Sequence, residues 1–409
     1  MESRTGCTGA DGTIALRFQR IASAVPRRFA IHLIVAMCLL SHSGFGGSRV
    51  VVTLYALELG ATQFTVGVLM ALYALMPMLL AIAIGRLADR VGARVPMLLG
   101  TAGVLLALLL PPLFPALATL YVSALLLGTS FHFFFVTVTG IAGGIGGAEN
   151  RARNYALVSM GFAAAGFVGP TTAGFAIDHF GYLTTFLLLA LFLLPPILLL
   201  WLKPGFLPGP GGTAHDGAER SALDLWRAPV LRSTFVASGI ISSAWDLFQF
   251  YLPVYGHSIG LSASAIGAIL GVFAAATFVI RIVLPYLVKR FHEAGILTYA
   301  IFVAAFAFAL MPFFRDAYAL AACGFLLGLG VGCGQPMSMS LIYALAPAGR
   351  ASEAAGVRVM VNNVMHLVIP LVFGSVGTAF GYMPVFLSNS ALLTAGGFLM
   401  RRKPALEAP

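Results

Sequence analysis

Apolar residues in this chain fall into long runs that short polar turns separate. Most runs reach about 20 residues, which is the length of helix needed to cross a bilayer. A backbone in hydrocarbon must satisfy its own hydrogen bonds, so we expect every run to be a helix. The predicted segments are 29–57, 64–84, 95–113, 118–145, 153–176, 182–202, 231–255, 264–288, 294–313, 317–345, 354–378 and 383–400, twelve in all.

One long polar stretch, 203–230, divides these segments into six and six, and its Pro and Gly content is typical of a flexible linker. We therefore expect a tail over 1–28, a six-helix bundle over 29–202, the linker, a second bundle over 231–400 and a short tail over 401–409. The first apolar run is too long for a signal-peptide core, so it is interpreted as a retained helix.

The two halves repeat at a constant offset of 200 residues. The offset aligns Tyr55 with Tyr255, and it aligns the tripeptide 180–182 with 380–382, both of which read Phe-Gly-Tyr. An even number of helices in each repeat gives both halves the same orientation. We expect an axis along the membrane normal, with a binding site between the halves near mid-membrane.

Composition agrees with an all-α membrane protein, because 59% of the residues are hydrophobic and only 9% are charged. The net charge of +10 does not indicate a nucleic-acid partner. All Lys and Arg residues except Arg49, Arg281 and Arg315 lie at the chain ends or in alternate loops. This is the positive-inside pattern, and it places both termini in the cytoplasm, with the lipid bilayer as the surrounding medium.

The most densely charged run is Gly85-Arg86-Leu87-Ala88-Asp89-Arg90-Val91-Gly92-Ala93-Arg94, between the second and third segments. It resembles the loop signature between helices 2 and 3 of the major facilitator superfamily of transporters. The matching positions are Gly85, Asp89, Arg90, Gly92 and Arg94, and the chain departs from the signature at residue 93.

Asp89 is the acid among these bases. It is placed to pair with Arg90 or Arg94, or to face the positive N-terminus of a nearby helix. The offset matches Asp89 to Lys289, so the two equivalent loops are not equivalent gates. We expect Asp89 to stabilise the state that is closed on the cytoplasmic side.

The segment 153–176 carries a second motif formed by Gly161, Gly166, Gly169, Pro170 and Gly174. It is similar to the helix-5 motif of proton-coupled drug antiporters in the superfamily, although the spacing after the proline is longer by one residue. Small residues at helical spacing also allow ordinary close packing of a neighbouring helix, which explains the motif about as well.

Polar residues inside the apolar segments are the candidate substrate or proton pathway, because an ionisable group at membrane depth is costly. They are Arg49, His132, Asp246, Gln249, Arg281, Gln335, Asn362, Asn363 and His366. The resemblance implies that helices 1, 4, 7 and 10 line the central cavity, which favours Arg49, His132, Asp246 and Gln335. For the histidines and amides, a satisfied inter-helix hydrogen bond is the preferred interpretation.

Asp246 is interpreted as the proton carrier, with Arg49 as its expected partner and Arg281 as the alternative. Phe131, Phe133, Phe134 and Phe135 are interpreted as packing or lipid-facing residues. Glu353 and Arg358 form either a cytoplasmic gate pair or an exposed ion pair.

The resemblance implies a monomeric secondary transporter of the cytoplasmic (inner) membrane that rocks two bundles about a small-molecule site. The sequence has no G-x-x-x-x-G-K-[S/T] phosphate loop and no metal-ligand spacing, so we expect neither an enzyme nor a cofactor. Proton-coupled export of a small organic molecule is the first interpretation. The alternatives are uptake of an anionic metabolite bound by Arg49 or Arg281, and a non-transporting receptor or channel.

Overall fold

The computed structural model describes residues 27–142, 145, 150–203, 207, 222–347 and 350–401. Most of the predicted tails and linker lie outside these residues. The first half contains α2 (Arg27–Glu58), α3 (Gln63–Val91), α4 (Arg94–Leu113), α5 (Leu117–Ala142), α6 (Arg151–Leu191) and α7 (Leu194–Leu202). The second contains α8 (Ala222–Arg227), α9 (Pro229–Ser258), α10 (Ala263–Val288), α11 (Glu293–Leu310), η3 (Met311–Phe313), α12 (Ala317–Leu345), α13 (Ala351–Phe380) and α14 (Tyr382–Arg401).

The predicted all-helical membrane architecture is confirmed, since none of the described residues forms a strand. Within the described part, ten helical spans are long and apolar enough to cross a membrane. One of these, 153–202, covers two predicted segments, and α9 is not among the ten. The count of twelve crossings therefore stays a prediction.

Glycines in the left-handed region mark the repeat. Gly60 and Gly260 have φ of 79° and 80°, and Gly181 and Gly381 have φ of 78° and 79°. Only glycine adopts these angles without strain. The chain turns at Gly181 within α6, and it turns again at Gly381 between α13 and α14. The same turns recur at the 200-residue offset that the sequence repeat predicts.

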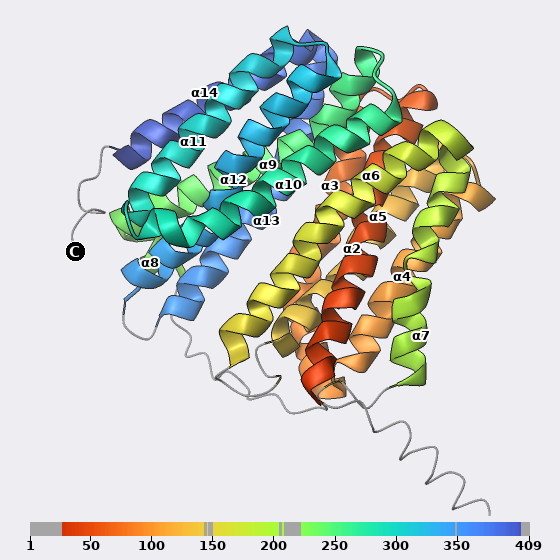
Figure 1. The fold of residues 1–409 in the computed structure, drawn as a ribbon, viewed down its shortest axis with the longest axis horizontal. Helices are drawn as coiled ribbons and strands as arrows, with labels where there is room; N and C mark the ends of the chain where they lie inside the picture. Colours follow the sequence, from red (N-terminus) through yellow and green to blue (C-terminus); the bar gives the residue numbers. More distant parts are fainter. Residues whose placement is uncertain are drawn as a thin grey trace, which may run out of the picture.

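The helices form two bundles, coloured red to lime and green to blue in Figure 1. The bundles meet through α6 with α10 and through α3 with α13. At these crossings the backbones are close enough that a side chain would not fit. A Cβ on Gly267 would lie 2.5 Å from the carbonyl oxygen of Pro170, and a Cβ on Gly67 would overlap the carbonyl oxygen of Pro370.

Hydrogen bonds between the bundles gather at one end of the molecule, which we call the closed end and define by the turns 59–62 and 259–262. Tyr251 donates to Gln63 Oε1 over 2.7 Å there, and two helix N-termini are capped across the interface. The opposite end, where Arg27 and Arg401 lie, is called the open end. Among the described residues, the nearest interbundle hydrogen bond to the open end joins Arg281 to Ser159.

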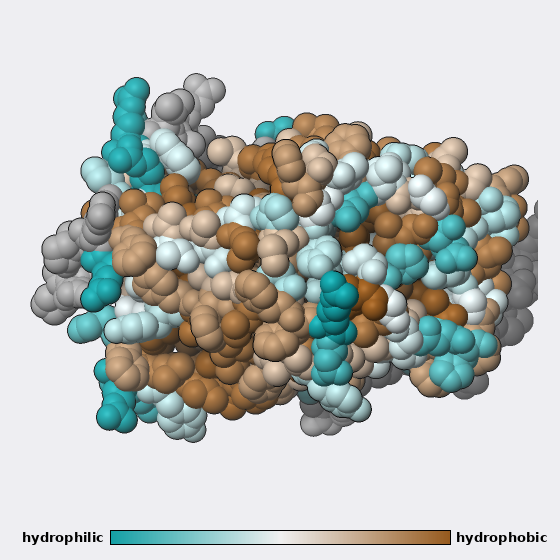
Figure 2. Space-filling model, turned by 90° about the horizontal axis from the view of Figure 1, so that it is seen from above, coloured by the Kyte–Doolittle hydropathy of each residue, from teal (hydrophilic) through white to brown (hydrophobic). Residues whose placement is uncertain are grey.

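The surface carries broad hydrophobic areas interrupted by smaller hydrophilic patches (Figure 2). Large apolar side chains are well exposed on it, among them Leu106, Phe175, Phe306 and Leu79. Contiguous exposed apolar surface of this kind is what a bilayer covers, so the structure agrees with an integral membrane protein.

Candidate functional site

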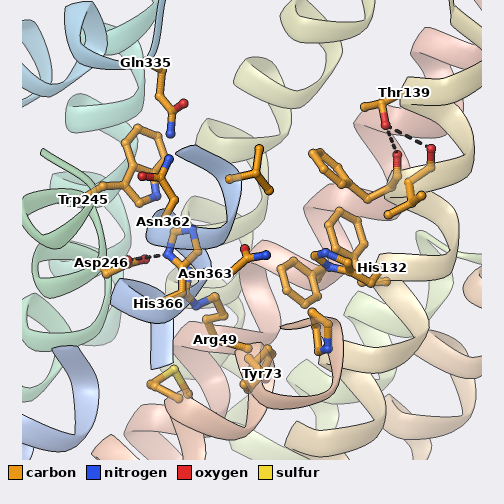
Figure 3. Close-up of a pocket in the computed structure, with 18 of the residues that line it drawn as sticks. Arg49, Tyr73, His132, Thr139, Trp245, Asp246, Gln335, Asn362, Asn363 and His366 are labelled. Carbon is orange, nitrogen blue, oxygen red and sulfur yellow. Dashed lines mark hydrogen bonds and ion pairs between the residues drawn. The ribbon is translucent and has the colours of Figure 1, made fainter. Parts of the chain in front are cut away.

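A cavity of about 590 Å³ lies between the two bundles. This volume is within the range of small-molecule sites, which is roughly 300–1,000 Å³. Three helices of each bundle supply its walls: α2, α3 and α5 on one side, and α9, α12 and α13 on the other. The polar or aromatic residues that line it are Phe45, Arg49, Tyr73, Phe131, His132, Phe135, Thr139, Trp245, Asp246, Gln335, Arg358, Asn362, Asn363 and His366 (Figure 3).

Asp246 and His366 form an ion pair or hydrogen bond between Asp246 Oδ2 and the ring nitrogen Nδ1 of His366. The Asp246 side chain is almost fully buried, whereas that of His366 is 34% exposed. Ser238, about two turns before Asp246 on α9, donates over 3.0 Å to Asn362, one turn before His366 on α13, and so joins the same two helices. The carboxyl group is therefore fixed to α13 and reaches the cavity through the histidine ring.

This arrangement corrects the expected partner of Asp246, which is His366 and not Arg49. The physical reason is the packing. Helix α13 lies against α9 within one bundle, whereas Arg49 projects from α2 of the other bundle. The spacing of residues along the chain does not reveal which neighbouring helix turns its polar face toward the carboxylate.

Arg49 lines the cavity without a polar partner. Its Nε is buried and donates to no acceptor among the described residues, and none of their carboxylates pairs with its guanidinium. Nearby, Ser48 and Tyr73 hydrogen-bond each other over 3.1 Å, so their hydroxyl groups are already engaged. Arg49 is thus a positive charge that faces the cavity with unused donors.

Arg358 is a cavity residue that the sequence interpretation placed at a gate. It is 4% exposed and bonds to α12 through Ser338 Oγ at 3.1 Å and through Gln335. Glu353 pairs instead with Arg350, at 2.7 Å. The predicted pair between Glu353 and Arg358 is therefore wrong. Arg358 lies two turns inside α13, and its side chain turns inward along α12.

Aromatic rings form one wall of the cavity. Phe45 and Phe131 stack with ring centroids 4.0 Å apart and planes 11° apart, and Phe135 lies in contact with Phe131. Phe134 is fully buried in the core, as the packing interpretation predicts. For Phe131 and Phe135 that interpretation is incomplete, because both also line the cavity. Their spacing of four residues puts them on one helix face, which was the available signal.

Two of the predicted pathway residues lie outside the cavity. Gln249 is one turn beyond Asp246 on α9 and is not among the lining residues. Arg281 donates to Ser159 Oγ over 3.3 Å, between α10 and α6, and its Nε is buried. The cavity instead uses Trp245, which precedes Asp246, and Tyr73 of α3.

The charged motif between α3 and α4 is mostly helix. Gly85 and Arg90 belong to α3, which continues to Val91 because its charged residues remain good helix formers beyond the apolar run. Gly92, with φ of 81°, ends the helix. Arg94 donates to the carbonyl oxygens of residues 200 and 201 at 2.9 and 3.1 Å, which caps the end of α7. The side chain of Asp89 lies outside the described residues.

The helix-5 glycines serve close packing on two sides. Gly161 and Gly169 face α2, where a Cβ would lie 2.9 Å from the Val35 oxygen and equally near the Gly47 nitrogen. Gly166 and Gly174 face α10 of the other bundle, and Pro170 approaches that helix with its carbonyl. The motif therefore joins the two bundles as well as the helices of its own.

The described residues contain no group of three or more His, Cys, Asp and Glu side chains that could hold a metal ion. The chemistry that the site offers is therefore that of a carboxyl–imidazole pair, a guanidinium with free donors, and aromatic faces.

A family model described as Major Facilitator Superfamily matches residues 34–370. The chain is 24% identical to the multidrug resistance protein MdtG of Klebsiella pneumoniae (strain 342), over 91% of this chain and 93% of that protein. It is 26% identical to the class D tetracycline resistance protein of Salmonella ordonez, over 75% of this chain and 78% of that protein.

Two solved structures share the fold. One is a POT family transporter in complex with 5-aminolevulinic acid, with a TM-score of 0.77 and 12% identity over 92% of this chain and 96% of that chain. The other is the nucleoside transporter NupG, with a TM-score of 0.76 and 13% identity over 93% of this chain and all of that chain. At these identities the likeness extends to the fold alone.

Proposed function

The chain belongs to the major facilitator superfamily, and on that premise we propose that it is a proton-coupled secondary transporter that exports a small organic molecule. The observation that carries the proposal is the Asp246–His366 pair, which borders a cavity of small-molecule size between two bundles. Export is the first candidate direction because relatives matched over most of their length are a multidrug and a tetracycline resistance protein.

The pair is suited to carrying a proton. A carboxylate oxygen and an imidazole nitrogen in contact are two proton-accepting atoms side by side, so a proton can be held between them. Asp246 is buried, and His366 is partly exposed, so the ring is the contact of the pair with the cavity. A substrate or a side chain that enters the cavity changes the field at the ring, which links proton occupancy to cavity occupancy.

Alternating access supplies the transport step. The positive-inside pattern assigns the open end to the cytoplasm, so the structure corresponds to a state that is closed toward the outside. Rocking the bundles about the α6–α10 and α3–α13 crossings would close the open end and break the hydrogen bonds of the closed end. At Gly67, Gly174 and Gly267 the helices meet backbone to backbone, so these crossings can serve as the pivots of that motion.

Uptake of an anionic metabolite is the second candidate, and Arg49 is the observation in its favour. The guanidinium has no acidic partner among the described residues, so an anion would complete its pairing. Which candidate holds depends on whether the proton and the substrate cross in opposite directions or together.

Transport by purified protein in sealed vesicles tests the proposal, with an imposed pH gradient and a panel of organic acids and cationic dyes. We expect substrate movement that stops when the gradient is collapsed. Asp246→Asn should abolish gradient-driven movement and retain exchange without a gradient. Asp224→Asn is the matched control, because that acid is exposed on α8, away from the cavity, and lies 3.9 Å from Arg227. Accumulation by Asp246→Asn driven by pH alone would remove the pair from coupling.

A further inference from the structure

The charges that line the cavity are unequal. Arg49 and Arg358 supply two positive charges, and Asp246 supplies the one negative charge among the lining residues. Asp246 is already bound to His366, and Arg358 is already bound to α12. Arg49 alone has no polar partner. The cavity therefore has an excess of positive charge, and its one uncommitted charged group is a cation.

An unpaired arginine at membrane depth is costly, and a counter-ion relieves that cost. The guanidinium offers a planar fork of donors that matches a carboxylate or a similar anion with two parallel hydrogen bonds. The described protein residues leave this fork vacant. Arg281, the other arginine that the sequence suggests as an anion binder, bonds to Ser159 and lies outside the cavity.

The surroundings of Arg49 specify the rest of the ligand. Phe45 precedes Arg49 by four residues on α2, so the two side chains share one helix face. Phe45 stacks on Phe131, and both rings border the cavity. Trp245 borders it from the second bundle, and Figure 3 shows Asn363 between that side and His132. A flat apolar group would contact aromatic faces while its charged end reaches the guanidinium.

We propose that the cavity binds an organic monoanion with a flat or aromatic body, whose anionic group docks on Arg49 and whose body packs against the Phe45–Phe131 stack. The proposal rests on the same cavity as the transport function, and it names the substrate class. A cationic substrate would find no free acid among the described lining residues, and it would meet Arg49 at close range. The cavity volume of about 590 Å³ holds a drug-sized molecule of this kind.

Trp245 provides a direct readout of binding that needs no transport. In a background with Trp201→Phe and Trp226→Phe, it is the remaining tryptophan of the chain. The probes are 3-phenylpropionate and 3-phenylpropylamine, which have the same ring and chain and opposite charges. We expect 3-phenylpropionate to change the Trp245 emission saturably, and 3-phenylpropylamine to bind about tenfold more weakly or not at all.

Substitutions of Arg49 test whether its side chain is the positive charge that binds the anion. Arg49→Gln should weaken 3-phenylpropionate binding by about tenfold or more, and Arg49→Lys, which keeps the charge and loses the fork, should have a smaller effect. Arg281→Gln is the matched control outside the cavity and should leave binding unchanged. Equal or tighter binding of the amine, no saturable binding of the anion, or unchanged binding by Arg49→Gln would each overturn the proposal.

The wild-type comparison of the two probes holds even if a variant fails to fold. Failure of the transport proposal gives a different result. If the anion binds through Arg49 but no pH-driven movement occurs in vesicles, the binding site stands and proton-coupled transport does not.

Discussion

Asp178 and Thr378 occupy equivalent positions in the two halves, and each one caps a helix of the opposite bundle. Asp178 accepts hydrogen bonds from the backbone nitrogens of Ala263 at 3.0 Å and Ser264 at 2.8 Å, at the start of α10. Thr378 accepts from the nitrogen of Phe64 at 2.8 Å, at the start of α3. The closed end is thus held by two caps that follow the 200-residue repeat, of which one is charged.

We predict that Asp178→Ala shifts the molecule away from the observed state. A carboxylate at a helix N-terminus contributes on the order of 1 kcal/mol through its hydrogen bonds and the helix dipole. Losing it weakens the closed end. Leu59 and Phe380 are exposed at that end and belong to opposite bundles. The distance between spin labels at these two positions, measured by double electron–electron resonance, should be longer in the variant than in the wild type.

Asp316→Ala is the matched control for this experiment. Asp316 caps α12 through the nitrogens of Tyr318 and Ala319, both at 3.0 Å, but it does so within one bundle. Thr378→Ala should give a smaller shift than Asp178→Ala, because a neutral acceptor is lost. The same label distance in Asp178→Ala and wild type would show that the caps do not hold the closed end.

A second prediction concerns the close approach at Gly67. A methyl group there would overlap the carbonyl oxygen of Pro370, so Gly67→Ala should separate α3 from α13 at a cost of about 1–3 kcal/mol. Gly85→Ala on the same helix has open space around it and should be neutral or slightly stabilising, since alanine favours helix. The two variants are compared by the spin-label distance and the thermal unfolding midpoint. Equal behaviour of the two would refute the packing argument.

A third prediction concerns orientation in the membrane. His292 and Arg315 lie in exposed turns at opposite ends of the α11 region. The positive-inside pattern assigns residue 292 to the cytoplasm and residue 315 to the outside. A single cysteine at position 292 should react with a membrane-impermeant thiol reagent only when the reagent is on the cytoplasmic side. A single cysteine at position 315 should react only when the reagent is outside. Labelling with the reverse sidedness would invert the orientation of the whole chain.

The sequence predicted the fold well because its signals are local or periodic. Apolar run length predicts the helices, and the 200-residue repeat predicts equivalent turns at Gly181 and Gly381. The main error in bounds was at the charged motif, where α3 continues to Val91. Hydropathy marks where a segment leaves hydrocarbon, and a helix does not have to end there.

The sequence indicates many of the residues that line the cavity but not how they pair, and their role in a substrate or proton pathway stays a prediction. Arg49, His132, Asp246, Gln335, Asn362 and His366 all line the cavity as expected of costly polar groups. The contact between Asp246 and His366 depends on how α13 is rotated about its axis relative to α9. Residue spacing along the chain does not reveal this rotation. The position of Arg358 near the start of an apolar run predicts a residue at the helix end, whereas its side chain turns inward to Gln335.

The last prediction joins the proton site to the anion site. A carboxylate bound at Arg49 and an ionised Asp246 repel each other across the cavity, and a proton on the Asp246–His366 pair relieves that repulsion. If this repulsion decides the coupling, 3-phenylpropionate binds more tightly as the pH falls, within the range in which the probe itself stays ionised, whereas direct competition between the proton and the anion gives the opposite dependence. A coupling of ordinary size corresponds to about fivefold or more. The titratable or charged groups that line the cavity are Arg49, Tyr73, His132, Asp246, Arg358 and His366.

Asp246→Asn should bind the anion with little dependence on pH, whereas His132→Gln, which removes the other ionisable ring of the cavity, should retain the dependence. Linkage is reciprocal, so an anion that binds better with the proton also raises proton occupancy, and the two would cross the membrane together. That outcome would favour uptake over export. Weaker binding at low pH, with the dependence lost in Asp246→Asn, would mean that proton and anion compete, and it would favour export. A pH dependence that persists unchanged in Asp246→Asn would place the coupling proton elsewhere.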